Sequence, residues 1–569
     1  MRHGTPPLPT TVPRHEAGRT TLTICPVCDG NRLFYQFSIE GHRLVRCDGC
    51  ALLSVNPQPA DTDLLRWLPD PPPAPERSDV GAAHVAALHR ATADGFLDLL
   101  ERYGAPTGAR LLEIGCGGGD FLARARSRGY AVAGVEFSEG ACDAARNQLG
   151  GGVEILRAAP DDLPGEDASY DVCVLSDVIE HVRDPRQLLA QAHRLLKPGG
   201  ILFFAVPSLD SLPARLLKNR WMQFRPDHLW YFKADTMETL LHRTGFGAVV
   251  QRAGRQATSF DYLAGHFARF PAGGFTPATG LLRRVLPRTV RGYPARTPSS
   301  YRVFLARSEQ RPARPLLSVV MPAYNEAATF AVAFERLLAK RLAAMDIEII
   351  VVESASTDGT REIVARYEDH PRVRVVWQDR ARGKGHAVRA GLEQARGDYV
   401  LIQDADLEYD LEDYDALLQP LLDGRAAFVL GARHGGVAWK MRQFSGQPFL
   451  SGIMNLAHLF FRSLINVSFG TRMRDPFTMY KVFRRDCLHG LRFECNRFDF
   501  DFEIVLKFLR KGYRPLEIPV NYRSRSFAEG KKVSILRDPL TWLRALVKCR
   551  LTGVDPLSEI ARQRRTQVL

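Results

Sequence analysis

Two long segments of the chain repeat one arrangement of hydrophobic and polar positions. In residues 91–310, and again in residues 311–569, short apolar runs alternate with amphipathic stretches of helical period. The apolar runs fit strands buried on both faces, and the amphipathic stretches fit helices that cover those strands. The pattern predicts two successive α/β domains, each with a mostly parallel sheet.

Four strand ends in these domains run into turns suited to ligand binding. Residues 110–122 pass from a strand through several glycines into a helix. Residues 316–330 and 346–364 pass from an apolar strand through a polar turn into a helix, and residues 397–410 place two aspartates at a strand end. Because open α/β sheets bind ligands at the carboxyl ends of their strands, these turns are the predicted sites.

The N-terminal ninety residues lack this pattern. Residues 1–21 are rich in proline and charge without an apolar core, which predicts a disordered leader and not a secretory signal. Residues 22–60 contain paired cysteines and form a predicted small domain, and the proline-rich residues 61–90 form a predicted linker. No run of eighteen apolar residues occurs in the sequence, which argues against a membrane span.

The charge balance favours anionic binding partners but does not identify one. Lys and Arg number 77 against 63 Asp and Glu, so the net charge is +14. Such a balance suits an anionic partner such as nucleic acid, phospholipid or a phosphorylated substrate. No nucleic-acid-binding motif is present in the sequence, so nucleic acid is not an expected partner.

The paired cysteines have the spacing of a metal site. Cys25 and Cys28, then Cys47 and Cys50, form two CxxC pairs, and the residues between them predict a hairpin turning at Gly41. Four thiolates complete a tetrahedral zinc shell with no open position, so a structural zinc ribbon is favoured over redox pairs. The other six cysteines lie mostly in apolar segments, which suits a reducing, cytoplasmic compartment.

The first α/β domain carries a glycine turn and an acid on the next strand. Gly115, Gly117 and Gly119 allow close approach of a ligand to the backbone, and Glu136 follows about twenty residues after the turn. This geometry serves ribose hydroxyls in dinucleotide and S-adenosylmethionine sites alike. The glycine turn and Glu136 leave both cofactors open.

The order of motifs over roughly residues 90–250 resembles the class I S-adenosylmethionine-dependent methyltransferases, which have a Rossmann-like fold. The resemblance lies in LLEIGCGGG, GVEFS, DDLP, YDVCVLSDVIEHVRDP and LLKPGG. One departure is Ala159, where many relatives carry an acid. The resemblance implies S-adenosylmethionine as cofactor, with these contacts: Glu113, Gly115, Gly117 and Gly119 at the methionine moiety, Glu136 at the ribose, and Asp161 near the adenine.

Two further features concern the methyl acceptor. His181 follows the strand that faces the cofactor methyl in relatives, and it is either a general base or a structural histidine. The aromatic residues 220–232 either line an acceptor pocket or pack in the core. The cysteine ribbon together with this segment is similar to sugar-modifying methyltransferases.

The second α/β domain carries a pair of aspartates at a strand end. Asp404 and Asp406 have one residue between them, so their side chains point the same way. Such carboxylates can share a hard divalent cation, Mg²⁺ or Mn²⁺. That cation would neutralise a pyrophosphate leaving group.

From about residue 316 to 550 the chain resembles the inverting family 2 glycosyltransferases of GT-A type, most closely the polyprenyl-phosphate sugar synthases. The resemblance lies in MPAYNE, STDGT, RGKGHAVRAGL, DAD, LGARH, DPFTMYKVFRRD, NRFDFDFE and RSFAEGKKV. One departure is Ser354, where relatives often carry an acid. The resemblance implies a nucleotide-sugar donor bound by Pro322, Tyr324, Glu326, Glu353, Asp358, Lys384, Arg433, Arg525 and Lys532, and a metal at Asp404 and Asp406.

The acceptor decides whether this domain needs a base. A phosphate acceptor is already anionic and needs only metal and cationic positioning. A glycan hydroxyl needs a base, for which Asp475, Asp501 and Glu503 are the available carboxylates. Asp475 has an alternative interpretation as a helix cap or as the partner of a nearby arginine.

Two helical segments are candidates for contact with a lipid surface. Residues 449–469 are apolar, and residues 537–551 form a basic amphipathic segment with Trp542. Either segment could also face the protein core. Together with the positive charge they predict peripheral contact with an anionic inner membrane face.

Three hypotheses follow for the whole chain. The first is a bifunctional enzyme of cell-surface glycan or glycolipid biosynthesis, which transfers a sugar to a lipid phosphate or glycan and methylates a sugar or other small molecule. The second keeps only the glycosyltransferase, with the methyltransferase-like domain as a cofactor sensor or scaffold. The third is a non-enzymatic zinc-ribbon scaffold. The intact glycine turn and aspartate pair favour an enzyme.

Overall fold

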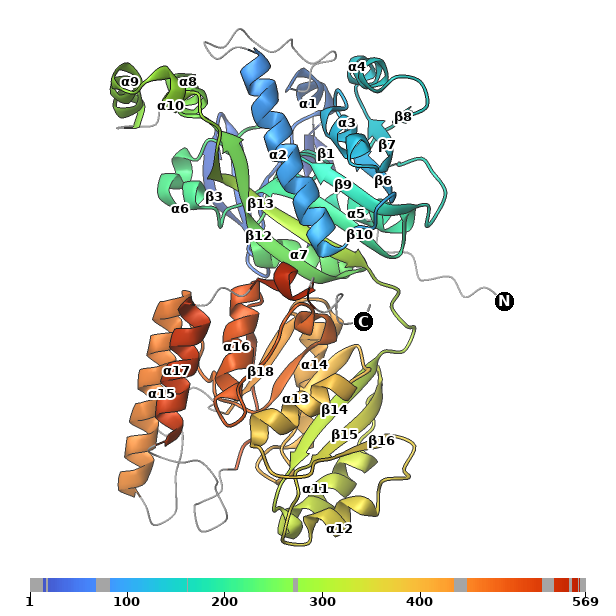
Figure 1. Ribbon diagram of the computed structural model, residues 1–569, viewed down its shortest axis with the longest axis vertical. Helices are drawn as coiled ribbons and strands as arrows, with labels where there is room; N and C mark the ends of the chain where they lie inside the picture. The colour runs from blue at the N-terminus through green and yellow to red at the C-terminus, as the bar shows by residue number, and fades with distance from the viewer. Residues whose placement is uncertain are drawn as a thin grey trace. The chain divides into compact units, whose positions relative to one another are not determined.

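The computed structural model describes residues 14–16, 19–67, 82–160, 162–269, 275–433, 448–523, 537–551, 555–560 and 562. The chain divides into two compact units, Met1–Gln310 and Arg311–Leu569 (Figure 1). Each unit is built on a seven-stranded sheet with helices against it, so the predicted α/β class is confirmed. Three predicted site residues lie outside the described residues: Asp161, Arg525 and Lys532.

The large sheet of the first unit has the order β12-β13-β10-β9-β6-β7-β8. Strands β8, β7, β6, β9 and β10 are parallel, in the doubly wound order that places a ligand beyond the end of the first strand. Strand β13 lies antiparallel between β10 and β12. The strands are β6 (Arg110–Ile114), β7 (Ala131–Glu136), β8 (Glu154–Arg157), β9 (Tyr170–Ser176), β10 (Leu196–Pro207), β12 (Phe246–Thr258) and β13 (Ala295–Ser308).

Helices of the first unit begin at recognisable caps. Ser138 accepts a hydrogen bond from Ala141 N at the start of α4, and Asp184 accepts two at the start of α5. Helix α5 buries a stripe of leucine and alanine, as an amphipathic helix on a sheet must. The helices are α1 (Asp61–Trp67), α2 (Ala82–Tyr103), α3 (Asp120–Ser127), α4 (Glu139–Leu149), α5 (Pro185–Leu195), α6 (Leu212–Leu217), the 3-10 turn Lys218–Arg220, α7 (Ala234–Arg243), α8 (Phe260–Arg269), α9 (Phe275–Val285) and α10 (Arg288–Arg291).

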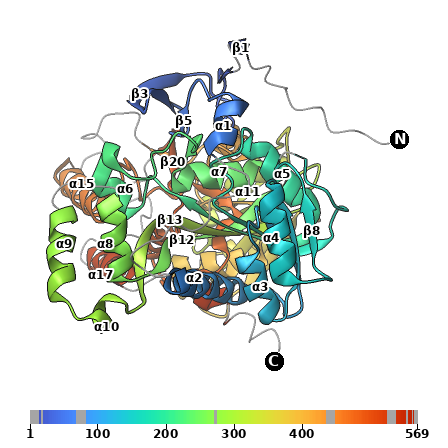
Figure 2. The ribbon, with the colours of Figure 1, turned by 90° about the horizontal axis from the view of Figure 1, so that it is seen from above.

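The cysteine-bearing segment forms a smaller sheet of order β11-β5-β4-β3, visible beside α1 in Figure 2. Strands β3 and β4 form the predicted hairpin, with positive φ at Glu40 and Gly41 in its turn. Strand β5 pairs with β11, which comes from far along the chain. The strands are β3 (Leu33–Ile39), β4 (His42–Cys47), β5 (Leu53–Val55) and β11 (Trp230–Tyr231).

The N-terminal segments predicted as leader and linker contain strands and helices. Within the predicted disordered leader, β1 (Arg14–Glu16) pairs with β2 (Arg19–Thr21). The predicted linker contains α1 and the first part of α2, because apolar positions there recur at helical spacing and Leu88 is buried. The cysteine segment shares its core with the large sheet, because Val27 and Leu52 pack in one cluster with residues of β6, β9 and β10.

The sheet of the second unit has the order β16-β15-β14-β17-β19-β18-β20. Strands β16, β15, β14 and β17 are parallel, β19 runs antiparallel between β17 and β18, and β20 is parallel to β18. The carboxyl ends of these four parallel strands therefore lie at the same edge of the sheet. The strands are β14 (Leu316–Ala323), β15 (Asp346–Glu353), β16 (Val373–Trp377), β17 (Tyr399–Ile402), β18 (Phe428–Ala432), β19 (Lys481–Arg484) and β20 (Leu516–Pro519).

Helices pack closely on this sheet where small residues permit it. A side chain at Gly391 of α13 would place its Cβ 2.4 Å from Val320 Cγ1 of β14, so glycine allows the contact between helix and sheet. The helices are α11 (Ala327–Ala339), α12 (Thr360–Ala365), α13 (Lys384–Gln394), the 3-10 turn Leu411–Asp413, α14 (Tyr414–Leu422), α15 (Pro448–Phe469), the 3-10 turn Arg485–Leu488, α16 (Phe500–Lys511) and α17 (Arg537–Leu551).

Helices α15 and α17 lie side by side, and part of their apolar surface packs within the protein. Trp542 of α17 packs against Phe461 of α15, with ring centroids 5.5 Å apart, and stacks on Phe502 of α16. Other apolar side chains of the pair are exposed, among them Phe460 and Leu540. Among the helices of the described ranges, none has the length and hydropathy needed to cross a membrane.

Candidate active sites

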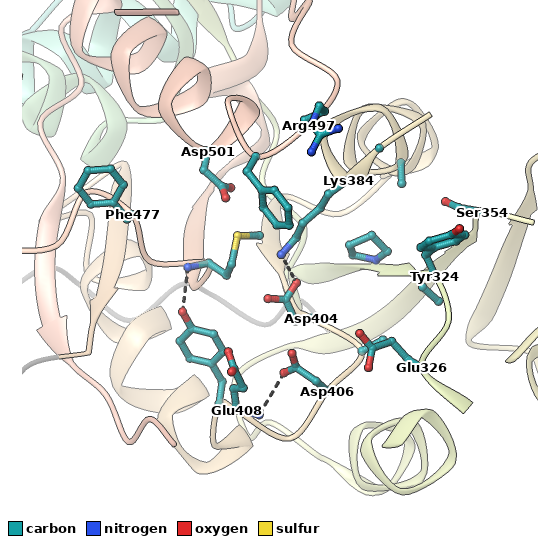
Figure 3. A pocket seen from close by; sticks show the side chains of 18 of the residues that line it. Tyr324, Glu326, Ser354, Lys384, Asp404, Asp406, Glu408, Phe477, Arg497 and Asp501 are labelled. Carbon is teal, nitrogen blue, oxygen red and sulfur yellow. Dashed lines mark hydrogen bonds and ion pairs between the residues drawn. The ribbon is translucent and has the colours of Figure 1, made fainter. Parts of the chain in front are cut away.

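A cavity of about 530 Å³ opens at the carboxyl edge of the second sheet. Its wall is formed by the residues after β14 and β17, the start of α13, and parts of α16 and α17. Figure 3 shows Asp404, Asp406, Glu326 and Lys384 near its middle, with Tyr324 and Ser354 at one end and Asp501 and Phe477 at the other. The sheet therefore brings the aspartate pair and most of the predicted donor residues into one cavity.

The aspartate pair is held by short local contacts. Lys384 Nζ, at the first residue of α13, lies 2.5 Å from Asp404 Oδ1. Asp406 Oδ1 accepts a hydrogen bond of 3.0 Å from the backbone N–H of Glu408, and Asp406 is 5% exposed. Burial opposes the charge of Lys384, but the carboxylates of Asp404 and Asp501 outweigh it and raise the Lys384 pKa. The pair therefore presents carboxylate oxygens beside a fixed ammonium group.

Pro322, near the end of β14, lines the cavity together with Tyr324 and Glu326, which follow β14. Ser354, which follows β15, also lines it. Ser354 Oγ lies 2.9 Å from Gln378 Oε1, and the amide of Gln378 contacts His386 of α13. This short polar chain connects the β15 end to α13. It gives Ser354, the departure from the family pattern, a fixed place in the wall.

Two predicted donor residues hold turns and do not line the cavity. Glu353 is fully buried, accepts the backbone N–H groups of Ala355 and Ser356, and pairs with Arg361 at 2.7 Å. Asp358 accepts the backbone N–H of Ala327, the first residue of α11, and that of Thr360 at the start of α12. Both carboxylates therefore fix the loops that carry lining residues.

Asp475 is likewise engaged within the protein. Its carboxylate accepts two side-chain hydrogen bonds of 2.8 Å from Arg433 and one from the Arg433 backbone N–H. Asp475 is 0% exposed, while Arg433 lines the cavity and lies over the ring of Tyr522. Burial opposes the charge of Arg433, but the Asp475 carboxylate raises its pKa well above the ordinary value. This geometry suits an arginine partner and does not suit a base.

Of the other two candidate bases, only Asp501 lines the cavity. Lys481 Nζ lies 3.4 Å from Asp501 Oδ1 at the start of α16. Glu503 accepts the backbone N–H groups of Glu494 and Cys495 and pairs with Lys507 at 2.7 Å. Glu503 therefore holds the preceding loop, and Asp501 is the carboxylate placed to meet an acceptor.

Sequence reasoning missed several residues of the wall. Arg382 and Arg497 add positive charge, and Phe498 lies under the Lys384 ammonium at 5.9 Å. Tyr522 and Trp542 close other parts of the wall. Arg382 and Arg497 belong to the motifs RGKGHAVRAGL and NRFDFDFE. The sequence therefore shows that both arginines lie near the site, but it does not show which way their side chains point.

In the first unit the glycine turn adopts the conformation that only glycine takes easily. Gly115, Gly117 and Gly119 have φ of 75°, 50° and 87°, and a Cβ on Gly115 would lie 2.4 Å from Val178 Cγ2. Glu136 at the end of β7 accepts the Gly117 N–H at 2.9 Å and two further backbone N–H groups. The turn and the acid are therefore adjacent, as a cofactor site at this edge requires.

Glu113 lies beneath this turn and is almost completely buried. Its Oε2 has no hydrogen-bond partner within the part of the chain that the structure describes. Burial raises the Glu113 pKa well above its ordinary value, and the charge of Glu136 adds to the effect. A cationic group of a ligand bound at the turn would stabilise the ionised Glu113 carboxylate and offset the cost of its burial.

His181 follows β9, with its Nδ1 2.9 Å from the backbone oxygen of Asp227. Burial lowers its pKa. Residues 220–232 divide between the two interpretations: Trp221 and Trp230 are buried in the core, while Asp227 and His228 face His181. The aromatic part of this segment is therefore core, and its polar part adjoins the strand end.

The four cysteines converge as predicted. Cys25 Sγ lies 3.5 Å from Cys50 Sγ, Cys28 Sγ lies 3.4 Å from Cys47 Sγ, and all four sulfurs lie within 4.8 Å of one another. In a tetrahedral site with Zn–S near ~2.3 Å the sulfurs stand close to ~3.8 Å apart. The donor set and its spacing fit Zn²⁺, which would hold β4 and the preceding loop together.

Comparison with known families agrees with this geometry in both units. Residues 85–251 match the family model described as a methyltransferase domain, and residues 318–491 match the one described as glycosyl transferase family 2. The chain joins a methyltransferase domain to a family 2 glycosyltransferase domain. The order predicted from the motifs is confirmed, and so is the transferase class of both domains.

Three relatives illustrate the range of the glycosyltransferase and methyltransferase domains. Glycosyltransferase AglD of Haloferax volcanii is 29% identical over 264 residues, covering 43% of this chain and 40% of the relative. Dolichyl-phosphate beta-glucosyltransferase ALG5C of Trichomonas vaginalis is 29% identical over 225 residues, covering 37% and 65%. Ubiquinone biosynthesis O-methyltransferase of Hahella chejuensis is 34% identical over 113 residues, covering 19% and 48%. The chain therefore spans between two fifths and two thirds of these relatives.

Proposed function

We propose that the glycosyltransferase domain transfers a sugar, with inversion, from a nucleotide-sugar to the phosphate of a polyprenyl lipid. The observation that carries this proposal is the placing of Asp404, Asp406 and Lys384 together in a cavity of about 530 Å³ at the strand ends. A cavity of this size is in the range of small-molecule sites, roughly 300–1,000 Å³. The similarity to a dolichyl-phosphate glucosyltransferase supports the lipid acceptor.

Asp404 and Asp406 are the residues that would hold Mg²⁺ or Mn²⁺, because both offer carboxylate oxygens to the same cavity. Such an ion would supply positive charge to stabilise the diphosphate leaving group. Lys384 and Arg433 line the same cavity and would bind the remaining phosphate charge. Pro322, Tyr324, Glu326 and Ser354 would form the nucleoside end.

Transfer with inversion is a single displacement. An acceptor oxygen forms a bond to the anomeric carbon while the bond from that carbon to the diphosphate oxygen breaks. An anionic phosphate oxygen needs no base, and Arg382 and Arg497 add cationic groups that would orient it. If the acceptor were a glycan hydroxyl, Asp501 would have to take its proton.

The exposed apolar side chains of α15 and α17 support an encounter with a lipid surface. Phe460, Val467, Leu540 and Leu551 are each at least 60% exposed. They lie on the two helices that Trp542 attaches to the cavity wall. We therefore place the domain at the cytoplasmic face of an anionic membrane, as a peripheral protein.

For the other domain we propose methyl transfer from S-adenosylmethionine to a sugar or another small molecule of the same biosynthetic route. Gly115, Gly117, Gly119 and Glu136 would bind the cofactor, because the turn after β6 and the acid at the end of β7 lie in contact with each other. His181 stands at the end of the neighbouring strand β9 and would help to activate the acceptor. A cell-surface glycan or glycolipid is the product class that unites the two activities.

The glycosyltransferase assignment is tested with the full chain, radiolabelled nucleotide-sugars, polyprenyl phosphate and Mn²⁺. We expect lipid-linked sugar with at least one donor, and loss of at least 99% of the product in Asp406→Ala. Asp415→Ala, on the exposed side of α14, is the matched control and keeps full activity. Unchanged turnover in Asp406→Ala removes the assignment.

The methyltransferase assignment is tested by calorimetry with S-adenosylmethionine and by release of labelled methyl to extracted glycolipids. We expect binding and turnover, both lost in Glu136→Ala. Binding without turnover on any acceptor would instead make this domain a cofactor sensor.

A further inference from the structure

Three metal-ligating side chains meet at one point of the methyltransferase unit, apart from the cysteines. Glu180 and His181 follow β9, and His228 precedes β11; one ligand atom from each lies within 4.8 Å of the others. The rings of the two histidines have centroids 4.8 Å apart and are nearly perpendicular. The backbone N–H of Leu229 donates to the backbone carbonyl oxygen of Glu180 at 2.8 Å, which holds the two segments together.

The hydrogen bonds of the two histidines fix which nitrogen carries the proton. His181 Nδ1 lies 2.9 Å from the backbone oxygen of Asp227, and a carbonyl oxygen can only accept. The proton therefore sits on Nδ1, and Nε2 keeps its lone pair. His228 hydrogen bonds the backbone of Gln223, and its Nδ1 has no partner among the described residues. Metal-ligating histidines are oriented in this way by a carbonyl behind the ring.

Glu180 is a buried carboxyl group beside a second acid, Asp177. It is 0% exposed, and neither of its carboxylate oxygens makes a hydrogen bond of good geometry within the described ranges; its polar neighbours are its own backbone N–H and the Asp177 side chain. The neighbouring Asp227 is already paired with Arg225 through two contacts of 2.9 and 2.7 Å, so Arg225 is committed elsewhere. A buried acceptor of this kind in a native fold calls for an ion or a proton.

We propose that Glu180, His181 and His228 bind a divalent transition-metal ion of the Zn²⁺, Fe²⁺ or Co²⁺ class. One carboxylate oxygen and two imidazole nitrogens are the donors that such ions prefer, and three ligands leave positions open. Ligand atoms lie about 2.0–2.2 Å from such an ion, so no two of them stand more than about 4.4 Å apart. The three side chains have ligand atoms within 4.8 Å of one another, which is close to this limit.

The use of this ion rests on the proposed methyl transfer. An acceptor hydroxyl bound at an open position would lose its proton to water, and its oxygen would form a bond to the cofactor methyl carbon. The bond from that carbon to sulfur breaks, and S-adenosylhomocysteine leaves with the electron pair. In this arrangement His181 holds the ion, and the ion activates the acceptor in place of a free imidazole base.

The test uses the full chain isolated with its ribbon zinc, titrated with Co²⁺ and followed by proton NMR in water. An imidazole bound to Co²⁺ gives an exchangeable N–H resonance shifted far outside the ordinary range. Neither the cysteine site nor the Asp404–Asp406 pair contains a histidine, so neither contributes such a resonance. We expect two shifted resonances from the wild-type protein, whether or not it transfers methyl groups.

The variants separate this site from other metal binding. His181→Gln and His228→Gln should each remove one resonance and weaken Co²⁺ binding at this site at least tenfold. His89→Gln, at an exposed position of α2, should leave both resonances in place. His181 is the less buried ligand, so its variant is the safer one for folding, which near-UV circular dichroism checks. Absence of shifted exchangeable resonances from the folded wild-type protein at saturating Co²⁺, or their persistence in both variants, overturns the proposal.

Discussion

Lys384 Nζ lies 2.5 Å from Asp404 Oδ1, at the point where α13 begins beneath the cavity. This contact sets a lysine charge directly beside one member of the aspartate pair. A divalent cation arriving at Asp404 would therefore meet a fixed positive charge, and the donor diphosphate would have to bridge the two. We infer that donor and metal bind cooperatively.

Lys384→Met should weaken donor binding more than metal binding. A hydrogen bond to a charged group contributes roughly 1.5–3 kcal/mol, which corresponds to a loss of roughly 10–150-fold in affinity for the nucleotide-sugar. The control is Arg425→Met, which removes an exposed charge paired with Asp423. Calorimetry with the donor and Mn²⁺ measures both variants. Equal donor affinity in Lys384→Met and wild type would contradict the placing of the diphosphate here.

Asp475→Asn should destabilise the glycosyltransferase unit. Asp475 and Arg433 are both buried and joined by three hydrogen bonds, so removing one charge leaves the other uncompensated. Breaking a buried pair costs about 3–5 kcal/mol in the free energy of unfolding. The matched control is Asp423→Asn in an exposed pair, where about 0–1 kcal/mol is expected. Urea unfolding followed by fluorescence measures both, and similar values for the two variants would refute the buried-pair argument.

Loss of zinc should unfold more than the ribbon. Val27 and Leu52 share a core with the large sheet, and β5 pairs with β11. Structural zinc contributes about 10–16 kcal/mol in small zinc domains, comparable to the whole stability of a domain, roughly 5–15 kcal/mol. We expect Cys47→Ser to abolish the thermal transition of the first unit. Calorimetry should show the second unit unfolding unchanged, and Cys495→Ser in that unit is the thiol control.

Glu113 should make the first unit less stable as pH rises. Its pKa in the folded protein is raised well above 4.5, the ordinary value it recovers on unfolding. The folded state therefore binds more protons than the unfolded state between these two pKa values, so the free energy of unfolding falls as pH rises through that window. Glu113→Gln should remove this dependence and be the more stable protein at neutral pH without cofactor.

S-adenosylmethionine should make the wild-type protein more stable than Glu113→Gln, which is the opposite of the order expected without the cofactor. Its ammonium group would favour an ionised Glu113 at the glycine turn. We expect the cofactor to raise the melting temperature of wild type more than that of Glu113→Gln, with at least tenfold weaker binding to the variant. Equal stabilisation of both would show that Glu113 does not meet the cofactor.

Parts of the fold could be predicted because their signals are local. The apolar run that forms β14 is buried along most of its length, and the glycines of the turn after β6 have the positive φ that their residue type permits. Asp404 and Asp406 follow β17, and the end of the apolar run Tyr399–Ile402 marks that position along the chain. Boundaries near the N-terminus were less predictable, because β5 forms its pair with β11 more than 170 residues away.

The carboxylates show what local signals leave out. Asp475, Asp501 and Glu503 all stand in recognisable motifs, yet only Asp501 reaches the cavity. Asp475 meets Arg433, which lies 42 residues earlier, and Glu503 meets backbone N–H groups of the preceding loop. A sequence motif therefore identifies which carboxylates are present, but it does not show which group each carboxylate contacts in the folded protein.

By itself, the sequence determined the two α/β domains, their order, the four-cysteine ribbon and the residues available at each strand end. Hydrophobic period, glycine conformation and cysteine spacing act over a few residues, so they can be read along the chain. The tertiary structure alone decided which carboxylates face a cavity, and it brought His228 to Glu180 and His181 across the gap between β9 and β11. These contacts depend on packing between segments that are distant in the sequence. Many residues of the same chemical type could pair with each group, and burial and hydrogen bonding in the folded protein determine which of them does.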